Sequence, residues 1–134
     1  MKKVLQVVLL TSLFVQGLAF AQEETDKYSF NELEQVSEFR KTRVQGIEVL
    51  DPRAVLLDLG RNESYLLILR RNLHGLVFAN RVEVSSTNNQ IRAGVDFVTA
   101  HDHRAVSGLI EKIYRLENSE ERRRVRFRLL KYAL

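Results

Sequence analysis

The sequence predicts a mainly β (α+β) fold: a compact antiparallel sheet, curled or barrel-like, of about five or six strands, with a short N-terminal and a C-terminal helix. Three observations predict it. Residues 65–69 form an unbroken apolar run, which is typical of a strand buried on both faces. Residues 81–84 and 91–97 alternate between polar and apolar side chains, which is typical of strands with one face toward the core. Short polar turn segments separate these runs, so neighbouring runs are expected to pair antiparallel.

Residues 1–21 have the features of a secretory signal peptide. Lys2 and Lys3 precede an apolar stretch, and Ala19 and Ala21 supply the small residues that signal peptidase requires. We therefore expect export to the periplasm, or secretion, with cleavage after Ala21. An uncleaved anchor is the less favoured alternative, because the apolar stretch is short for a bilayer span. The chain has no cysteine, which excludes a disulfide and lipid attachment at a cysteine.

Residues 22–36 form a polar N-terminal segment with a short predicted helix. Ser29 and Glu32 have the spacing of a capping box, and apolar residues follow at helical intervals. The pattern predicts a helix over residues 30–39.

Residues 37–117 are expected to form the β-rich domain. Strands are predicted over residues 43–50, 54–59, 65–70, 82–86, 91–97 and 109–115, with turns at 51–52, 60–63, 72–75 and 87–89. Residues 106–117 also fit a helix with one imperfect position, but the surrounding β pattern favours a strand. Tyr65, Phe78 and Phe97 are interpreted as core residues, and residues 99–104 as a loop.

Residues 118–134 are predicted to form a basic C-terminal helix, packed on the domain or extending from it. Cleavage would reduce the net charge from +4 to +2, and this tail alone carries +4. Two apolar stripes are visible, one containing Val125 and Leu129 and the other Phe127 and Leu130, so one is expected to pack and the other to be spare. The candidates for contact with an anionic surface are Arg122, Arg123, Arg124, Arg126, Arg128 and Lys131.

Two interpretations of this tail remain open. An arginine-rich amphipathic helix can lie on an anionic membrane or dock on an acidic partner. It can also be a solvated helix whose charges keep the protein soluble, which we favour. Expected export argues against nucleic acid as a partner.

The pair His101 and His103 is the one metal-site candidate, because alternate residues of an extended chain point to the same side. A functional site needs further ligands, and only His74 and Asp96 could supply them. We favour a solvated polar loop. Ser64, Ser85, Ser86 and Ser107 lie in no nucleophile motif, and the carboxylates of residues 48, 58, 63, 83, 96 and 111 suit the polar sides of strands. No catalytic residue and no cofactor is predicted.

The order of segments resembles a known family. Tyr65-Leu66-Leu67 is followed by Leu76-x-Phe78-Ala79, then Ile91-x-Ala93-Gly94-x-Asp96-x-Val98, and finally Ile110-x-x-Ile113. Over about residues 37–117 this pattern resembles small exported proteobacterial proteins known only as a domain of unknown function. The resemblance implies a cysteine pair in other members at the positions held here by Leu73 and Gly108. Loss of both cysteines together fits a structural crosslink better than thiol chemistry.

The sequence thus favours an exported, non-catalytic β-domain protein that acts as an envelope-associated interaction module. Its partner would be a protein or another envelope component. The alternatives are a periplasmic protein that binds a small ligand or a metal, and, less favoured, a metal-dependent hydrolase at the loop of His101 and His103.

Overall fold

The computed structural model describes residues 27–131. The predicted signal peptide, residues 1–21, lies outside them, as do the last three residues of the predicted tail. Contacts divide the chain into two units, Met1–Phe30 and Asn31–Leu134. Of the first unit only residues 27–30 are described, and they include a turn at 27–28. All elements below belong to the second unit.

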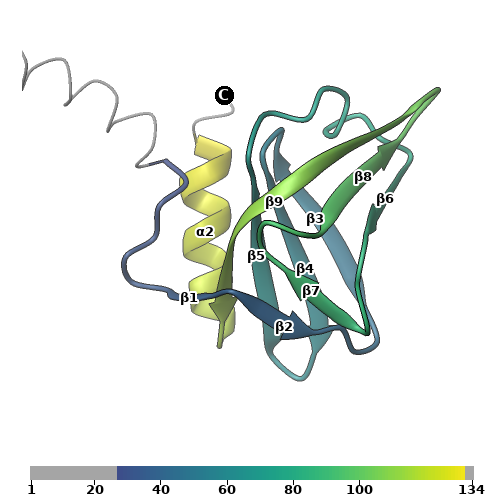
Figure 1. Ribbon diagram of the computed structural model, residues 1–134. Coiled ribbons are helices and arrows are strands. Elements are labelled where there is room, and N and C mark those ends of the chain that lie inside the picture. The colour runs from purple at the N-terminus through teal and green to yellow at the C-terminus, as the bar shows by residue number, and fades with distance from the viewer. Residues whose placement is uncertain (1–26, 132–134) are drawn as a thin grey trace, which may run out of the picture. The chain divides into compact units, whose positions relative to one another are not determined.

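The second unit is built around one antiparallel sheet that curls until it is nearly closed (Figure 1). Its strands run in the order β3-β4-β5-β9-β8-β6, β1 pairs with β9, and β2 and β7 form a separate two-stranded sheet. The predicted fold class is confirmed, including the C-terminal helix. The elements are β1 (Glu34–Val36), β2 (Glu38–Arg40), β3 (Gly46–Asp51), β4 (Ala54–Gly60), β5 (Glu63–Leu69), β6 (Arg81–Val84), β7 (Gln90–Arg92), β8 (Phe97–His101), β9 (Ala105–Leu116) and α2 (Ser119–Lys131).

Strand β9 holds the sheet together because it pairs with three other strands. Its first half pairs with β8, its second half pairs with β5, and residues 113–115 also pair with β1. This 12-residue strand settles the ambiguity of residues 106–117 in favour of a strand. The local sequence pattern of these residues also fits a helix. Hydrogen bonding to strands on both edges of β9 therefore determines that they form a strand.

Strand β5 is buried on both faces, as its apolar run predicts. Tyr65, Leu67 and Leu69 point into the curl of the sheet and belong to the main hydrophobic cluster. Leu66 and Ile68, equally buried, alternate with them and lie on the opposite face. The sheet therefore needs a second cover outside the curl.

Helix α2 supplies this outer cover (Figure 1). Val125 and Leu129 are 1% and 0% exposed, whereas Phe127 is 70% exposed. One apolar stripe thus packs and the other is spare, as predicted. Asn118 caps the helix, since its Oδ1 accepts a hydrogen bond from the Glu121 amide at 2.9 Å.

One end of the curled sheet is closed by the small sheet of β2 and β7. The Phe39 ring of β2 stacks on Tyr65, with ring centroids 3.8 Å apart and planes 7° from parallel. Ile91 of β7 is fully buried in the same cluster. Burial raises the pKa of Tyr65 to about 12. The hydrogen bond that the Tyr65 hydroxyl donates to Glu63 Oε1 at 2.7 Å also raises this pKa. Tyr65 is therefore a core residue, as expected.

The predicted N-terminal helix over residues 30–39 is wrong. The segment forms the two short strands β1 and β2, separated by a bend at Ser37, whose carbonyl accepts a hydrogen bond from the Ala93 amide at 2.9 Å. The bend explains the misleading pattern, because a break between strands also places apolar side chains three residues apart. Pairing with β9 and β7 overrides the local capping signal.

The predicted strand over residues 91–97 is also wrong in part. It breaks between β7 and β8 at a turn in which Gly94 has a φ of +80°. Asp96, expected on the polar face, is 2% exposed and accepts hydrogen bonds from the Arg92 amide at 2.8 Å and the Ser85 hydroxyl at 2.9 Å. A buried carboxylate therefore holds this turn.

The short turns between strands follow their sequence signals. Arg61 and Asn62 both have positive φ in the tight connection between β4 and β5, and Asn88 and Asn89 do so before β7. Two consecutive positive φ values are typical of the hairpin turns that match the twist of a sheet, and asparagine tolerates them. Both predicted turns are confirmed.

Leu73 and Gly108 touch each other, although they are about 35 residues apart in the sequence. A Cβ atom added at Gly108 would lie 3.5 Å from Leu73 Cδ1 and 3.2 Å from Leu69 Cδ1. The resemblance puts a cysteine pair of other members at these two positions, and a crosslink requires such proximity. In this chain the buried Leu73 side chain fills the space instead.

We predict that the double variant Leu73→Cys/Gly108→Cys forms a disulfide when oxidised. Closing a loop of this length reduces the entropy of the unfolded chain, so the oxidised form should be more stable than the reduced form by about 4 kcal/mol. Urea unfolding of both forms measures the difference, and comparing them within one variant cancels the loss of the leucine. Free thiols after oxidation, or equal midpoints, would contradict the prediction.

Candidate functional site

A groove with a volume of about 680 Å³ lies at the end of the sheet away from β2 and β7. Three connections form it: the turn between β3 and β4, the loop between β5 and β6, and the turn between β8 and β9 together with the start of β9. It is lined by Pro52, Asn72, Leu73, His74, Gly75, Leu76, Val77, Phe78, Ala100, Asp102, His103, Arg104 and Val106. Its lining is mainly apolar, which is typical of sites for small organic ligands.

The loop between β5 and β6 is fixed in place by its backbone. The Leu73 amide donates to the Pro52 carbonyl at 2.8 Å, and the Asn80 amide donates to the His101 carbonyl at 2.9 Å. Between these points, successive turns close with amide-to-carbonyl bonds from Leu76 to Leu73 and from Phe78 to Gly75, at 3.1 and 3.2 Å. The groove wall is therefore tied to two other connections of the sheet.

The same loop presents two kinds of apolar side chain. Leu73 and Leu76 are 5% and 1% exposed and belong to the core, so they form the floor of the groove. Val77 is 53% exposed and Phe78 is 81% exposed. The interpretation of Phe78 as a core residue is therefore wrong, because Leu73 and Leu76 already fill the end of the core. Phe97, at 43% exposed, is also outside the core.

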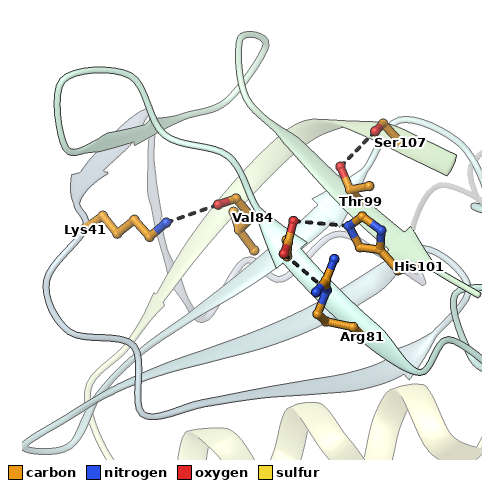
Figure 2. Close-up of polar contacts among 7 residues, drawn as sticks. Lys41, Arg81, Val84, Thr99, His101 and Ser107 are labelled. Atoms are coloured by element: carbon orange, nitrogen blue, oxygen red, sulfur yellow. Dashed lines mark hydrogen bonds and ion pairs between the residues drawn. The ribbon is translucent and has the colours of Figure 1, made fainter. Parts of the chain in front are cut away.

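The two candidate metal ligands have different surroundings. His101 belongs to β8, not to the loop expected for residues 99–104, and its Nε2 lies 3.1 Å from Glu83 Oε2 (Figure 2). His103 lines the groove, as does His74, whereas Asp96 is buried under the turn before β8. Within residues 27–131, no three histidine, aspartate or glutamate side chains are grouped closely enough to hold a metal ion.

Polar side chains of β6, β8 and β9 form a row of pairs near His101 (Figure 2). Arg81 Nε lies 3.2 Å from the Glu83 carboxylate that His101 also contacts. The hydroxyls of Thr99 and Ser107 share a hydrogen bond of 2.8 Å. The pairs of Glu83 with His101 and of Thr99 with Ser107 join neighbouring strands, whereas Arg81 and Glu83 both belong to β6. Such pairs stabilise a sheet without requiring a ligand.

A second hollow, of about 490 Å³, lies where β3 and β6 would meet if the sheet were fully closed. Ile47, Leu57 and Val82 are among the residues that line it. Lys41 Nζ donates to the Val84 carbonyl at 3.2 Å and so bridges to the edge of β6 (Figure 2). This hollow is smaller than the groove and has fewer exposed apolar side chains beside it.

The predicted basic tail is largely paired within the domain. Arg126 Nε binds Glu48 Oε2 at 2.8 Å, and Arg122 Nη1 donates to the buried Ser64 hydroxyl at 3.3 Å. Arg124 binds Glu120 at 3.0 Å along the helix, and Arg128 lies 3.9 Å from Glu32. Arg123 is exposed and makes no such pair among the described side chains, and the side chain of Lys131 lies outside them. Arg122 and Arg126 therefore connect α2 to strands of the sheet.

We predict that Arg126→Ala lowers the free energy of unfolding by about 1 kcal/mol, because it removes both the contact with Glu48 and the packing of the arginine stem. Arg123→Ala is the matched control and should change it by less than about 0.5 kcal/mol. Urea unfolding measures both. Equal midpoints for the two variants would show that the pairing with Glu48 does not hold the helix.

The groove itself was missed by sequence reasoning. Its three connections are far apart along the chain, and each contains only ordinary turn residues. One signal was present: residues 76–78 place three apolar side chains in a loop between strands, more than a short loop needs.

The described part of the chain contains no helix of the length and apolar character needed to cross a membrane. Neither the curated proteins nor the solved structures include a significant match to this chain. A family model does match, described as "Family of unknown function (DUF6491)", and it covers residues 1–128. Because the match extends over nearly the whole chain, the protein belongs to this family of unknown function.

Proposed function

We propose that this protein is an exported, non-catalytic binding protein whose ligand occupies the groove. The observation that carries the proposal is the combination of a groove of about 680 Å³ with exposed apolar side chains at Val77, Phe78 and Val106. Exposed apolar side chains that gather beside a hollow typically mark a binding site, because a ligand that covers them removes apolar surface from water. The groove is the surface at which this proposal puts the envelope-associated interaction that the sequence leads us to expect.

The polar side chains support binding over catalysis. Asp96 holds a turn, Ser64 accepts a bond from Arg122, and Glu48 anchors α2. Each of these potential acids or nucleophiles already has a structural partner. The two groove histidines, His74 and His103, are accompanied in its lining by one carboxylate, Asp102, and by no serine or threonine.

The groove is also a better candidate than the C-terminal helix for contact with another molecule. On α2 the exposed apolar side chains are Phe127 and Leu130, and the arginines at 122, 124, 126 and 128 have partners within the domain. Among the described side chains of α2, Arg123 is the candidate for contact with an anionic surface that has no such partner. The groove instead gathers its exposed apolar side chains around a hollow.

A screen of small apolar and amphipathic molecules by thermal melting tests the binding function. A ligand present at a hundred times its Kd should stabilise the folded protein by about 2.7 kcal/mol and raise the Tm. The shift should disappear in Phe78→Ser, which changes an exposed side chain of the groove, and persist in Phe127→Ser, which changes an exposed side chain elsewhere. If no compound raises the Tm, or if Phe78→Ser responds as the wild type does, the groove is not the binding site.

Export is tested on the natural chain produced in a Gram-negative host. We expect a periplasmic protein whose first residue is Gln22, because the residues at 19 and 21 suit signal peptidase. Ala19→Arg is the matched variant, and it should accumulate as precursor because a large charged side chain does not fit the peptidase site. A wild-type protein that keeps Met1 and stays in the cytosol would contradict export.

A further inference from the structure

The groove combines an apolar floor with two apolar walls. Leu73 and Leu76 form the floor, Val77 and Phe78 lie in the connection on one side, and Val106 at the start of β9 on the other. Val106 is 41% exposed although it belongs to a strand. A narrow apolar ligand, such as a single acyl chain, could cover these exposed side chains and gain the free energy of their burial.

The polar side chains of the groove include one arginine and one carboxylate. These are Arg104 and Asp102, and His74 and His103 add two imidazoles to the lining. Arg104 is exposed, and its guanidinium makes no ion pair with the described side chains, unlike Arg53, which binds Glu111 at 3.0 Å. The Asp102 amide donates to the Arg104 carbonyl at 3.2 Å, so these residues form one tight turn at the groove.

Two more arginines directly follow β5, next in the sequence to the loop that lines the groove. Arg70 and Arg71 directly precede the lining residue Asn72, and both are exposed. Arg104 is therefore the one arginine of the groove lining, and two further exposed arginines directly precede the lining in the sequence. An anionic group is the chemistry that complements this arrangement, since guanidinium binds carboxylate with two parallel hydrogen bonds.

We propose that the groove binds a single-chain carboxylate of the fatty-acid type, with its chain along the floor of Leu73 and Leu76 and its carboxylate at Arg104. The inference rests on the proposed binding function and names its ligand class. The volume of about 680 Å³ lies within the range of sites for small organic ligands. Such a ligand is an amphiphile of the kind that a protein near the envelope meets.

The test compares three probes that share a ten-carbon chain: decanoate, decanol and decyltrimethylammonium, each below its aggregation concentration. Isothermal titration calorimetry with the purified domain from Gln22 onward, or with the full chain, measures the Kd of each. Decanoate should bind up to about fivefold more tightly than decanol, since one favourable charge contact at an exposed site is worth about a factor of five at most. Decyltrimethylammonium should bind most weakly.

Two pairs of variants locate the site. Arg104→Glu should weaken decanoate binding about tenfold and leave decanol binding unchanged, whereas Arg123→Glu, which reverses an exposed charge on α2, should change neither. Phe78→Ser should weaken all three probes, and Phe127→Ser none. Decyl phosphate is a fourth probe that separates the carboxylate from a phosphate headgroup. Tighter binding of decyl phosphate than of decanoate would reassign the ligand to a phosphorylated amphiphile and overturn the carboxylate proposal.

The remaining outcomes separate this inference from the proposed function. If the three ten-carbon probes bind equally and depend on Phe78, the groove is a binding site but the anionic ligand class is wrong. If decanoate binds equally well to Arg104→Glu, the placement of the carboxylate is overturned. If no probe binds in a way that depends on Phe78 and the broader screen also shows no ligand, the proposed function fails together with the inference.

Discussion

Burial of β5 on both faces is the constraint on which the rest of this domain depends. From Ser64 to Leu69 every side chain is at most 5% exposed, so the sheet must curl over one face and α2 must cover the other. Ser64 is the polar position of the outer face, and Arg122 of the helix donates a hydrogen bond to it. The basic helix is therefore part of the core packing. Deleting it would expose Leu66 and Ile68, so its surface role is better examined by changes at exposed positions than by truncation.

The two ends of the curled sheet differ because their connections differ. At one end Phe39 stacks on Tyr65 and Ile91 fills the remaining space, so the core is sealed by aromatic and aliphatic side chains. At the other end Leu73 and Leu76 complete the core, and the same loop then continues with Val77 and Phe78, for which no interior space remains. The groove is a consequence of this order: residues 73–78 contain four apolar side chains in a loop whose backbone is fixed, and only the first two are buried.

Sequence reasoning succeeded where local chemistry and packing require the same structure. The apolar run of β5, the turn at Arg61 and Asn62, and the capped C-terminal helix are examples. It failed at the N-terminal segment, where an apolar spacing of three came from a bend at Ser37 between two strands. It failed again at Asp96. The alternating pattern predicts that this carboxylate faces solvent, but the carboxylate is buried and accepts a hydrogen bond within the turn that precedes β8. The groove could not be predicted, because its walls come from three connections that only the pairing of β4 with β5 and of β5 with β9 brings together.

The contact between Leu73 and Gly108 links the stability of the domain to the groove. At this point the loop is held by burial and by the hydrogen bond from the Leu73 amide to the Pro52 carbonyl, without a covalent bond. Substitutions at Leu73 or Leu76 therefore remove core packing as well as the groove floor, and large-to-small changes in a core typically cost about 2–5 kcal/mol. Substitutions at Val77, Phe78 and Val106 do not remove core packing, because these side chains are exposed. Selection on these three positions can change what the groove recognises while the fold beneath it stays the same, and this separation of roles is what a fixed scaffold with a variable binding surface requires.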